Sequence, residues 1–135
     1  MNKRVLSLVL IFVLLCTMSI SVSAASASTV GVTSGGTLGI VKTKAELNVY
    51  TDHATATTWS VNAPGIILNT LLTYHYKDAN YENRQLTVTG SATATAYPGI
   101  IPNVPSAIRG ESVHRVYSLE GEWGSWTSNL SANVW

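Results

Sequence analysis

Apolar and polar residues alternate with a period of two along much of the chain beyond residue 38. Over 41–51, one set of alternate positions holds Val, Thr, Ala and Leu, while the other holds mainly Lys, Glu and Asn. The segment 86–97 alternates most clearly, with Leu, Val, Gly and Ala at even positions and mostly Thr at odd ones. Successive side chains of a strand point to opposite faces, so this period predicts half-buried β-strands. No stretch shows a sustained helical period.

The same pattern and the turn residues predict further strands. Residues 57–63 alternate in the same way, with Trp59 on the apolar face, and Pro64 ends this strand. The run 66–76 is apolar on both faces, which predicts a central strand. Asp78-Ala79-Asn80 predicts a turn, Gly90 a bulge, and the Pro-rich segment 98–105 a loop. The last strands are expected over 111–119 and 126–135. About six strands predict an all-β fold, a small antiparallel β-sandwich, with a small β-barrel as the alternative.

The first 24 residues differ in composition from the rest. Lys3 and Arg4 precede the segment 5–18, which is apolar except for Ser7 and Thr17. A length of about 14 residues matches the apolar region of a secretory signal and falls short of the roughly 20 that span a bilayer. Small residues at 22–24 supply a cleavage site, and those at 25–27 a second candidate. We therefore expect 1–24 to be a signal peptide that is removed, and the product to be secreted and extracellular.

The remainder is expected to hold one domain. Residues 25–37 consist of Ser, Thr, Gly and small apolar residues without a convincing period, which predicts a flexible N-terminal arm. Residues 38–135 are then a single β-sandwich domain. Cys16, the only cysteine, lies in the leader, so the mature chain would contain neither a disulfide nor a thiolate metal ligand.

The charge gives no case for binding nucleic acid. Two of the eight Lys and Arg residues lie in the leader, and the remaining six stand against seven Asp and Glu. Lys42 and Lys44, beside Glu46, form too small a cluster to displace the counterions of DNA or RNA. We also expect no stable membrane span in the mature chain.

Three histidines, His53, His75 and His114, are the only imidazoles. No two of them have the short spacing typical of a metal site, so neither a metal nor a cofactor is predicted, although convergence in the fold is left open. Ser112 and His114 would share one face of a strand and Glu111 the other, a geometry that conflicts with a catalytic triad. No catalytic residue is assigned, and a small extracellular hydrolase using His114 stands as an alternative.

Aromatic residues gather near the C-terminus. Trp126 shares one face of the predicted strand with Leu130 and Ala132 and is expected in the core. Trp123 lies in a Gly-rich turn and is expected to be exposed as a flat platform. The sequence thus favours a non-catalytic binding module of a secreted bacterial protein, with the cell wall, a carbohydrate or a protein as partner. Its candidate binding residues are Glu111, His114, Tyr117 and Trp123. A secreted antibacterial or membrane-active toxin is the other alternative.

Overall fold

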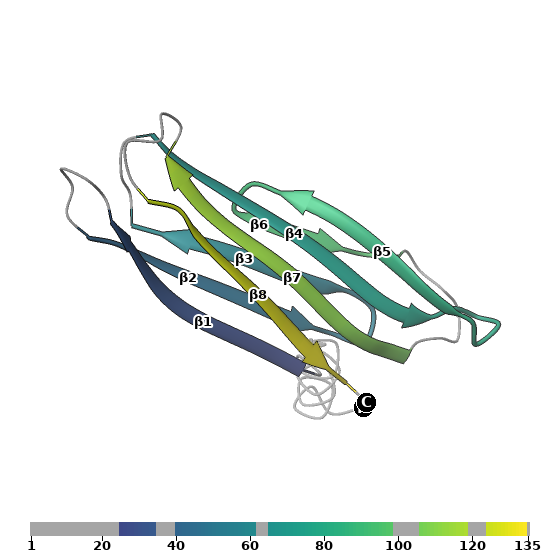
Figure 1. Ribbon diagram of the computed structural model, residues 1–135. Coiled ribbons are helices and arrows are strands. Elements are labelled where there is room, and N and C mark those ends of the chain that lie inside the picture. The colour runs from purple at the N-terminus through teal and green to yellow at the C-terminus, as the bar shows by residue number, and fades with distance from the viewer. Residues whose placement is uncertain (1–24, 35–39, 62–64, 99–105, 119–123, 135) are drawn as a thin grey trace, which may run out of the picture.

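A computed structural model describes residues 25–34, 40–61, 65–98, 106–118 and 124–134 (Figure 1). These residues contain eight β-strands and no helix. The strands are β1 (Ala25–Ser34), β2 (Ile40–Val49), β3 (Ala54–Ser60), β4 (Ile66–Lys77), β5 (Asn83–Gly90), β6 (Thr93–Ala96), β7 (Ser106–Ser118) and β8 (Trp126–Asn133). The predicted signal peptide, 1–24, lies outside the described residues, and so does most of the predicted loop 98–105.

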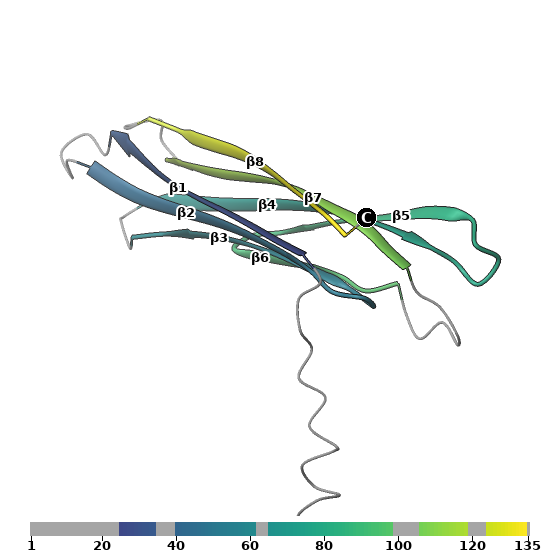
Figure 2. The same cartoon turned by 90° about the horizontal axis from the view of Figure 1, so that it is seen from below.

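Two four-stranded sheets form a sandwich. The first sheet has the order β1-β2-β3-β6 and the second the order β5-β4-β7-β8, with every neighbouring pair antiparallel. Figure 2 shows the sheets as two separate layers. The predicted β-sandwich is confirmed, and the alternative of a closed barrel is wrong. The prediction of a central strand over 66–76 is also confirmed, because β4 lies between β5 and β7.

Small inward side chains on strands β3 and β6 face larger ones on the second sheet. Leu47 and Val49 of β2 and Leu72 and Tyr74 of β4 are fully buried. Apart from Thr58, the inward residues of β3 and β6 are alanines, at 54, 56, 94 and 96, all at most 3 % exposed. Alanine lets the opposite layer approach closely while apolar surface is still removed from water. The buried positions of β2 are the ones that the alternation predicted.

The segment 86–97, expected as one strand, is two strands in different sheets. β5 pairs with β4 in the second sheet, and β6 pairs with β3 in the first. The alternation runs unbroken through both because the chain keeps the same side inward as it crosses over. Gly90 ends β5 at this crossing rather than forming a bulge inside a strand. A Cβ atom there would lie 1.9 Å from the Thr93 carbonyl oxygen, so only glycine fits this position.

Residues 25–34, expected to belong to a flexible arm, form strand β1. They pair with β2 along their whole length. Their inward positions hold only Ala, Thr and Gly, so the contrast between the two faces that marks a strand is weak in the sequence. Small residues are required because Trp126 of the second sheet lies against β1. A Cβ atom on Gly31 would lie 2.1 Å from the Trp126 indole nitrogen. Trp126 is half-buried and faces inward, as predicted.

Trp59 points away from the core, which is opposite to the expectation. In β3 the buried residues are Ala54, Ala56 and Thr58, and Trp59 is 51 % exposed. A shift of one residue in the expected alternation moves every side chain of a strand to the other face. The large apolar side chain at 59 suggested the wrong set of inward positions.

Replacing Gly90 by alanine should reduce the free energy of unfolding by about 3 kcal/mol, because the new methyl group meets a backbone oxygen that cannot move aside. The matched control is Gly65→Ala, where φ is +67° but no atom lies within 4 Å of the added carbon. Backbone strain alone should cost about 1 kcal/mol there. Urea unfolding followed by Trp fluorescence measures both, and equal losses would contradict the steric argument.

Candidate functional site

His114 lies between the two sheets in a chain of hydrogen-bonding side chains. Its Nδ1 is 2.9 Å from Thr58 Oγ1, its Nε2 is 2.7 Å from Ser112 Oγ, and Thr58 Oγ1 is 2.6 Å from Thr70 Oγ1. The Thr70 hydroxyl donates to the carbonyl oxygens of residues 91 and 92, at 3.1 Å each. All four side chains are at most 3 % exposed.

The donors of this chain can be assigned in order. Because Thr70 donates to carbonyl oxygens, the Thr58 hydroxyl donates to Thr70 Oγ1. The Nδ1–H of His114 then donates to Thr58. Burial lowers the pKa of His114 from 6.5 to about 4, so the imidazole is neutral near pH 7. Its Nε2 is then unprotonated and accepts the hydrogen bond from the Ser112 hydroxyl.

This arrangement does not give a catalytic site open to substrate. Ser112 and His114 have the spacing of a nucleophile and its base, but both lie out of reach of solvent. Glu111 points to the opposite face of the sheet, as its place in the strand predicted, and completes no triad. His114 is likewise no part of a binding surface, although the sequence placed it among the candidate binding residues.

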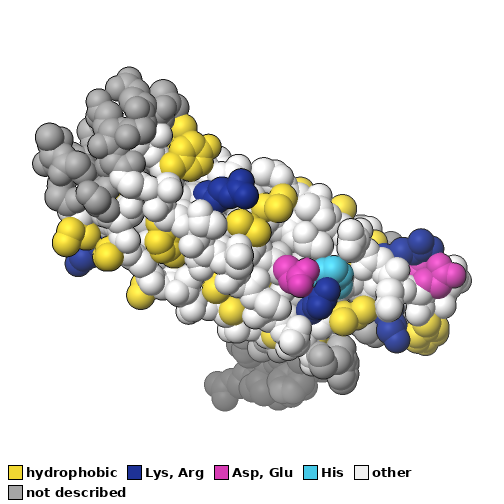
Figure 3. Space-filling view, viewed as in Figure 1, with side chains coloured by type: hydrophobic (Ala, Val, Ile, Leu, Met, Phe, Trp, Pro, Cys, Tyr) yellow, Lys and Arg dark blue, Asp and Glu magenta, His cyan; other side chains and the backbone are white. Residues whose placement is uncertain are grey.

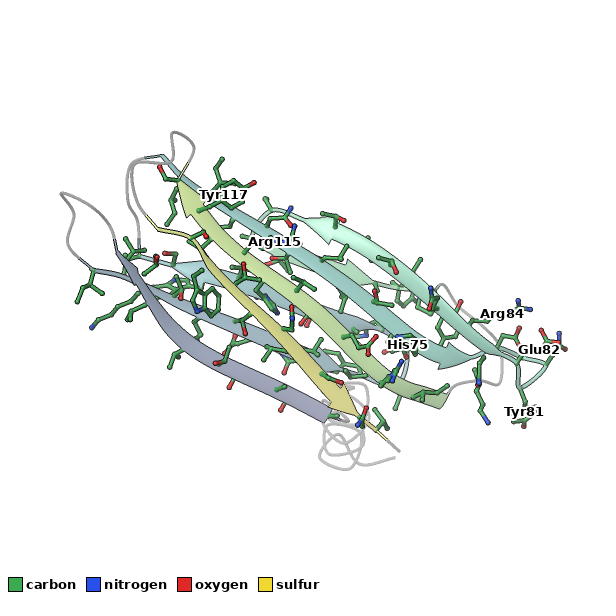
Figure 4. The ribbon with its side chains drawn as sticks, viewed as in Figure 1. His75, Tyr81, Glu82, Arg84, Arg115 and Tyr117 are labelled. Carbon is green, nitrogen blue, oxygen red and sulfur yellow. The ribbon has the colours of Figure 1, made fainter. Side chains whose placement is uncertain are left out.

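The outer face of the second sheet carries Glu111 and Tyr117 well apart. Glu111 is 2.9 Å from His75 Nε2 and 3.5 Å from Arg109 Nη2. Tyr117 lies six residues further along β7, about 20 Å away in an extended strand, and Figure 4 shows it at the far end from His75. Figure 3 shows this face as mainly polar and uncharged, with scattered charged and apolar groups. The three described candidates, Glu111, His114 and Tyr117, therefore do not form one site, and Trp123 is outside the described residues.

The three histidines do not converge. His53 lies in the β2–β3 turn, where it stacks on Tyr50 with ring centroids 4.3 Å apart and contacts Asp52. His75 is on the outer face of the second sheet, and His114 is in the core. Within the ranges that the structure describes, no three His, Cys, Asp or Glu side chains come together as metal ligands.

The tip of the β4–β5 hairpin holds an exposed tyrosine in a fixed turn (Figure 4). Asp78 Oδ1 accepts hydrogen bonds from the backbone amides of Asn80 and Glu82, and Oδ2 accepts one from Arg84 Nε. The hydrogen bond from Arg84 is the main cause that lowers the pKa of Asp78. Tyr81 has φ of 61° and is 75 % exposed. The turn predicted from Asp78-Ala79-Asn80 is confirmed.

Of the seven large apolar side chains that are exposed among the described residues, four lie together on the outer face of the first sheet, in what we call the Trp59 surface. Its members are outward side chains of β1, β2 and β3 that share one end of the sheet. They are Val30, Val32, Ile40, Lys42, Lys44 and Trp59. The four apolar members are between 51 % and 76 % exposed. All but Ile40 line a shallow depression of about 450 Å³.

The strand register builds this surface. Lys44 lies opposite Val30 on one side and Trp59 on the other, and Lys42 lies opposite Val32. Lys44 forms an ion pair with Glu46. Among the described residues, no carboxylate lies within ion-pair distance of Lys42. The surface is thus apolar with a positive excess.

Sequence reasoning missed the Trp59 surface for two reasons. The valines fell in the expected arm, and Trp59 was assigned to the inner face. A signal was present in the alanines at 54 and 56, which share the opposite parity and mark the inward side of β3.

Comparisons with protein-family models, with curated proteins and with solved structures found no match to this chain. No helix in the described part of the chain has the length and hydropathy to cross a membrane.

The stability of the fold should depend on pH through His114. The His114 imidazole binds a proton near pH 6.5 in the unfolded chain and near pH 4 in the folded protein. Its contribution to the free energy of unfolding is therefore complete above about pH 6.5 and is lost as the pH falls toward 4. The loss is on the order of 3 kcal/mol. Chemical unfolding between pH 4 and 7 measures it.

His114→Gln should remove this step, the loss of stability between pH 6.5 and pH 4, because glutamine does not titrate. Ser112→Ala and His75→Gln should both keep it, the first because the buried imidazole remains and the second because it changes only a surface imidazole. A step of equal size in His114→Gln would show that another group causes the pH dependence.

Proposed function

We propose that this chain is an exported, non-catalytic binding module that attaches to a partner protein through the Trp59 surface. The observation that carries the proposal is the group of four exposed apolar side chains around two lysines on one sheet face. Exposed apolar groups of this kind mark interaction sites on monomeric proteins. Tryptophan is among the residues that contribute most to binding energy when an interface covers them.

The chemistry of the Trp59 surface favours a protein over a polysaccharide. Trp59 offers one flat ring, but the described residues that line the depression with it have no amide or carboxylate side chain to orient sugar hydroxyls, and the nearby Glu46 is ion-paired with Lys44. The positive excess at Lys42 complements a partner that presents carboxylates next to apolar side chains. An anionic membrane also presents negative charge next to apolar groups, so binding to lipid vesicles, which the toxin alternative requires, is tested in parallel.

Trp59→Ala should weaken binding by about 2 kcal/mol, roughly thirtyfold, because it removes the largest side chain of the contact. The measurement is capture on immobilised protein from an extract of the producing cells' surface and medium proteins. Tyr81→Ala is the matched control, because it removes an exposed aromatic from a different surface. Support requires that one polypeptide is retained by the wild type and by Tyr81→Ala, and is lost with Trp59→Ala.

Lys42→Glu should slow association and invert its dependence on salt, because the charge that complements the partner changes sign. Parallel arms use isolated cell wall, cellulose and vesicles containing anionic lipid. Retention in one of these arms that Trp59→Ala abolishes, without capture of a protein, would replace the protein partner by that ligand. Capture that Trp59→Ala leaves unchanged would reject the surface itself.

A further inference from the structure

Within the described residues, strand β1 is an edge of the first sheet, and its own sequence has none of the features that usually protect an edge against pairing. Within the described residues no strand pairs with the side of β1 that faces away from β2. An edge strand directs alternate amides and carbonyls outward, and proteins usually protect such edges with charge, proline or short length. β1 has ten residues and contains no charged residue and no proline.

The opposite side of the sandwich is protected. There the first sheet ends in β6, which has only four residues, and the second sheet ends in β5, which carries Arg84. β8 lies on the same side as β1 and is also free of charge and proline (Figures 1 and 2). The unprotected edges therefore share one side of the molecule.

The sequence of β1 is complementary to itself. Val30 and Val32 flank Gly31 and both point outward, with 76 % and 62 % of their surface exposed. Antiparallel pairing of two copies of β1 about Gly31 places Val30 opposite Val32 of the second copy, and Val32 opposite its Val30. Thr29 then faces Thr33. Pairs of β-branched residues directly opposite each other stabilise antiparallel strands.

Strand β1 is already ordered in the single chain. Trp126 of β8 lies against Gly31 from inside the sandwich, and β2 pairs with β1 along its whole length. The edge is thus ordered before a second strand arrives, so pairing carries little cost in backbone entropy.

From these observations we propose that two copies of this chain associate through their β1 edges, in antiparallel register about Gly31, into one continuous eight-stranded sheet. The dimer leaves the outer face of that sheet open. The two Trp59 surfaces would then meet across the new strand pair and offer two attachment points, which raises avidity for a repetitive partner. The dimer itself needs no partner protein and does not rest on the proposed function.

Light scattering over a range of concentrations tests the association, using the purified protein with its N-terminus determined by mass spectrometry. The wild type should dimerise, and Val32→Lys should weaken the dimer about tenfold or more, because each copy loses a valine contact and gains a charge at the edge. Thr95→Lys places the same charge on β6 and is the matched control. Trp59→Ala should leave the dimer unchanged, which separates this proposal from the proposed binding function.

Cysteine pairs test the register, in a Cys16→Ser background so that no other thiol is present. Opposite residues of antiparallel strands have Cα atoms about 5 Å apart, within the range of a disulfide, whereas diagonal neighbours lie about 7–8 Å apart. A mixture of Val30→Cys and Val32→Cys chains should therefore cross-link to each other faster than either does to itself. A monomer at all concentrations, a dimer unaffected by Val32→Lys, or preferential self-linking of Val30→Cys would overturn the proposal.

Discussion

The close approach of the alanine-lined strands β3 and β6 to the second sheet is the constraint on which the rest of the structure depends. Six of the ten residues in the main core cluster are alanines. Alanine buries little apolar area, so each contact contributes modestly and the total depends on the sheets lying flat against each other over their length. Leu72 and Tyr74 fill the space that the alanines of β3 and β6 leave open. A larger inward residue on either side would separate the layers.

Polar groups also enter the core where the two layers meet. Thr58, Thr70 and His114 are buried beside the alanine-rich cluster, and each has a hydrogen-bond partner. The bond from His114 to Thr58 joins β7 of one sheet to β3 of the other, so it fixes how the layers lie on each other. A buried polar group that loses its partner costs more than the bond itself contributes. The network therefore selects one alignment of the sheets.

Sequence patterns predicted the fold where the two faces of a strand differ strongly, and failed where they do not. In β2, charged and polar residues alternate with mainly apolar ones, and the inward face followed directly. In β1 the inward residues are small and two outward ones are valines, so the pattern does not show which face of the strand points inward. The contact of Trp126 with Gly31 identifies that face. The Trp59 surface depends on the register of three strands, which no local pattern contains. Strand geometry predicted that Ser112 and His114 lie on one face of the sheet and Glu111 on the other. The burial of His114 could not be predicted in this way, because it depends on the facing sheet.

The burial of His114 also determines the order of events in acid. The ring is fully covered and its unprotonated nitrogen is occupied by the Ser112 hydroxyl, so a proton from solvent reaches it only after the sheets have begun to separate. Proton uptake then follows opening and does not drive it. Acid acts by trapping molecules that have opened spontaneously, and the lifetime of the folded protein at low pH is governed by how often the two layers part.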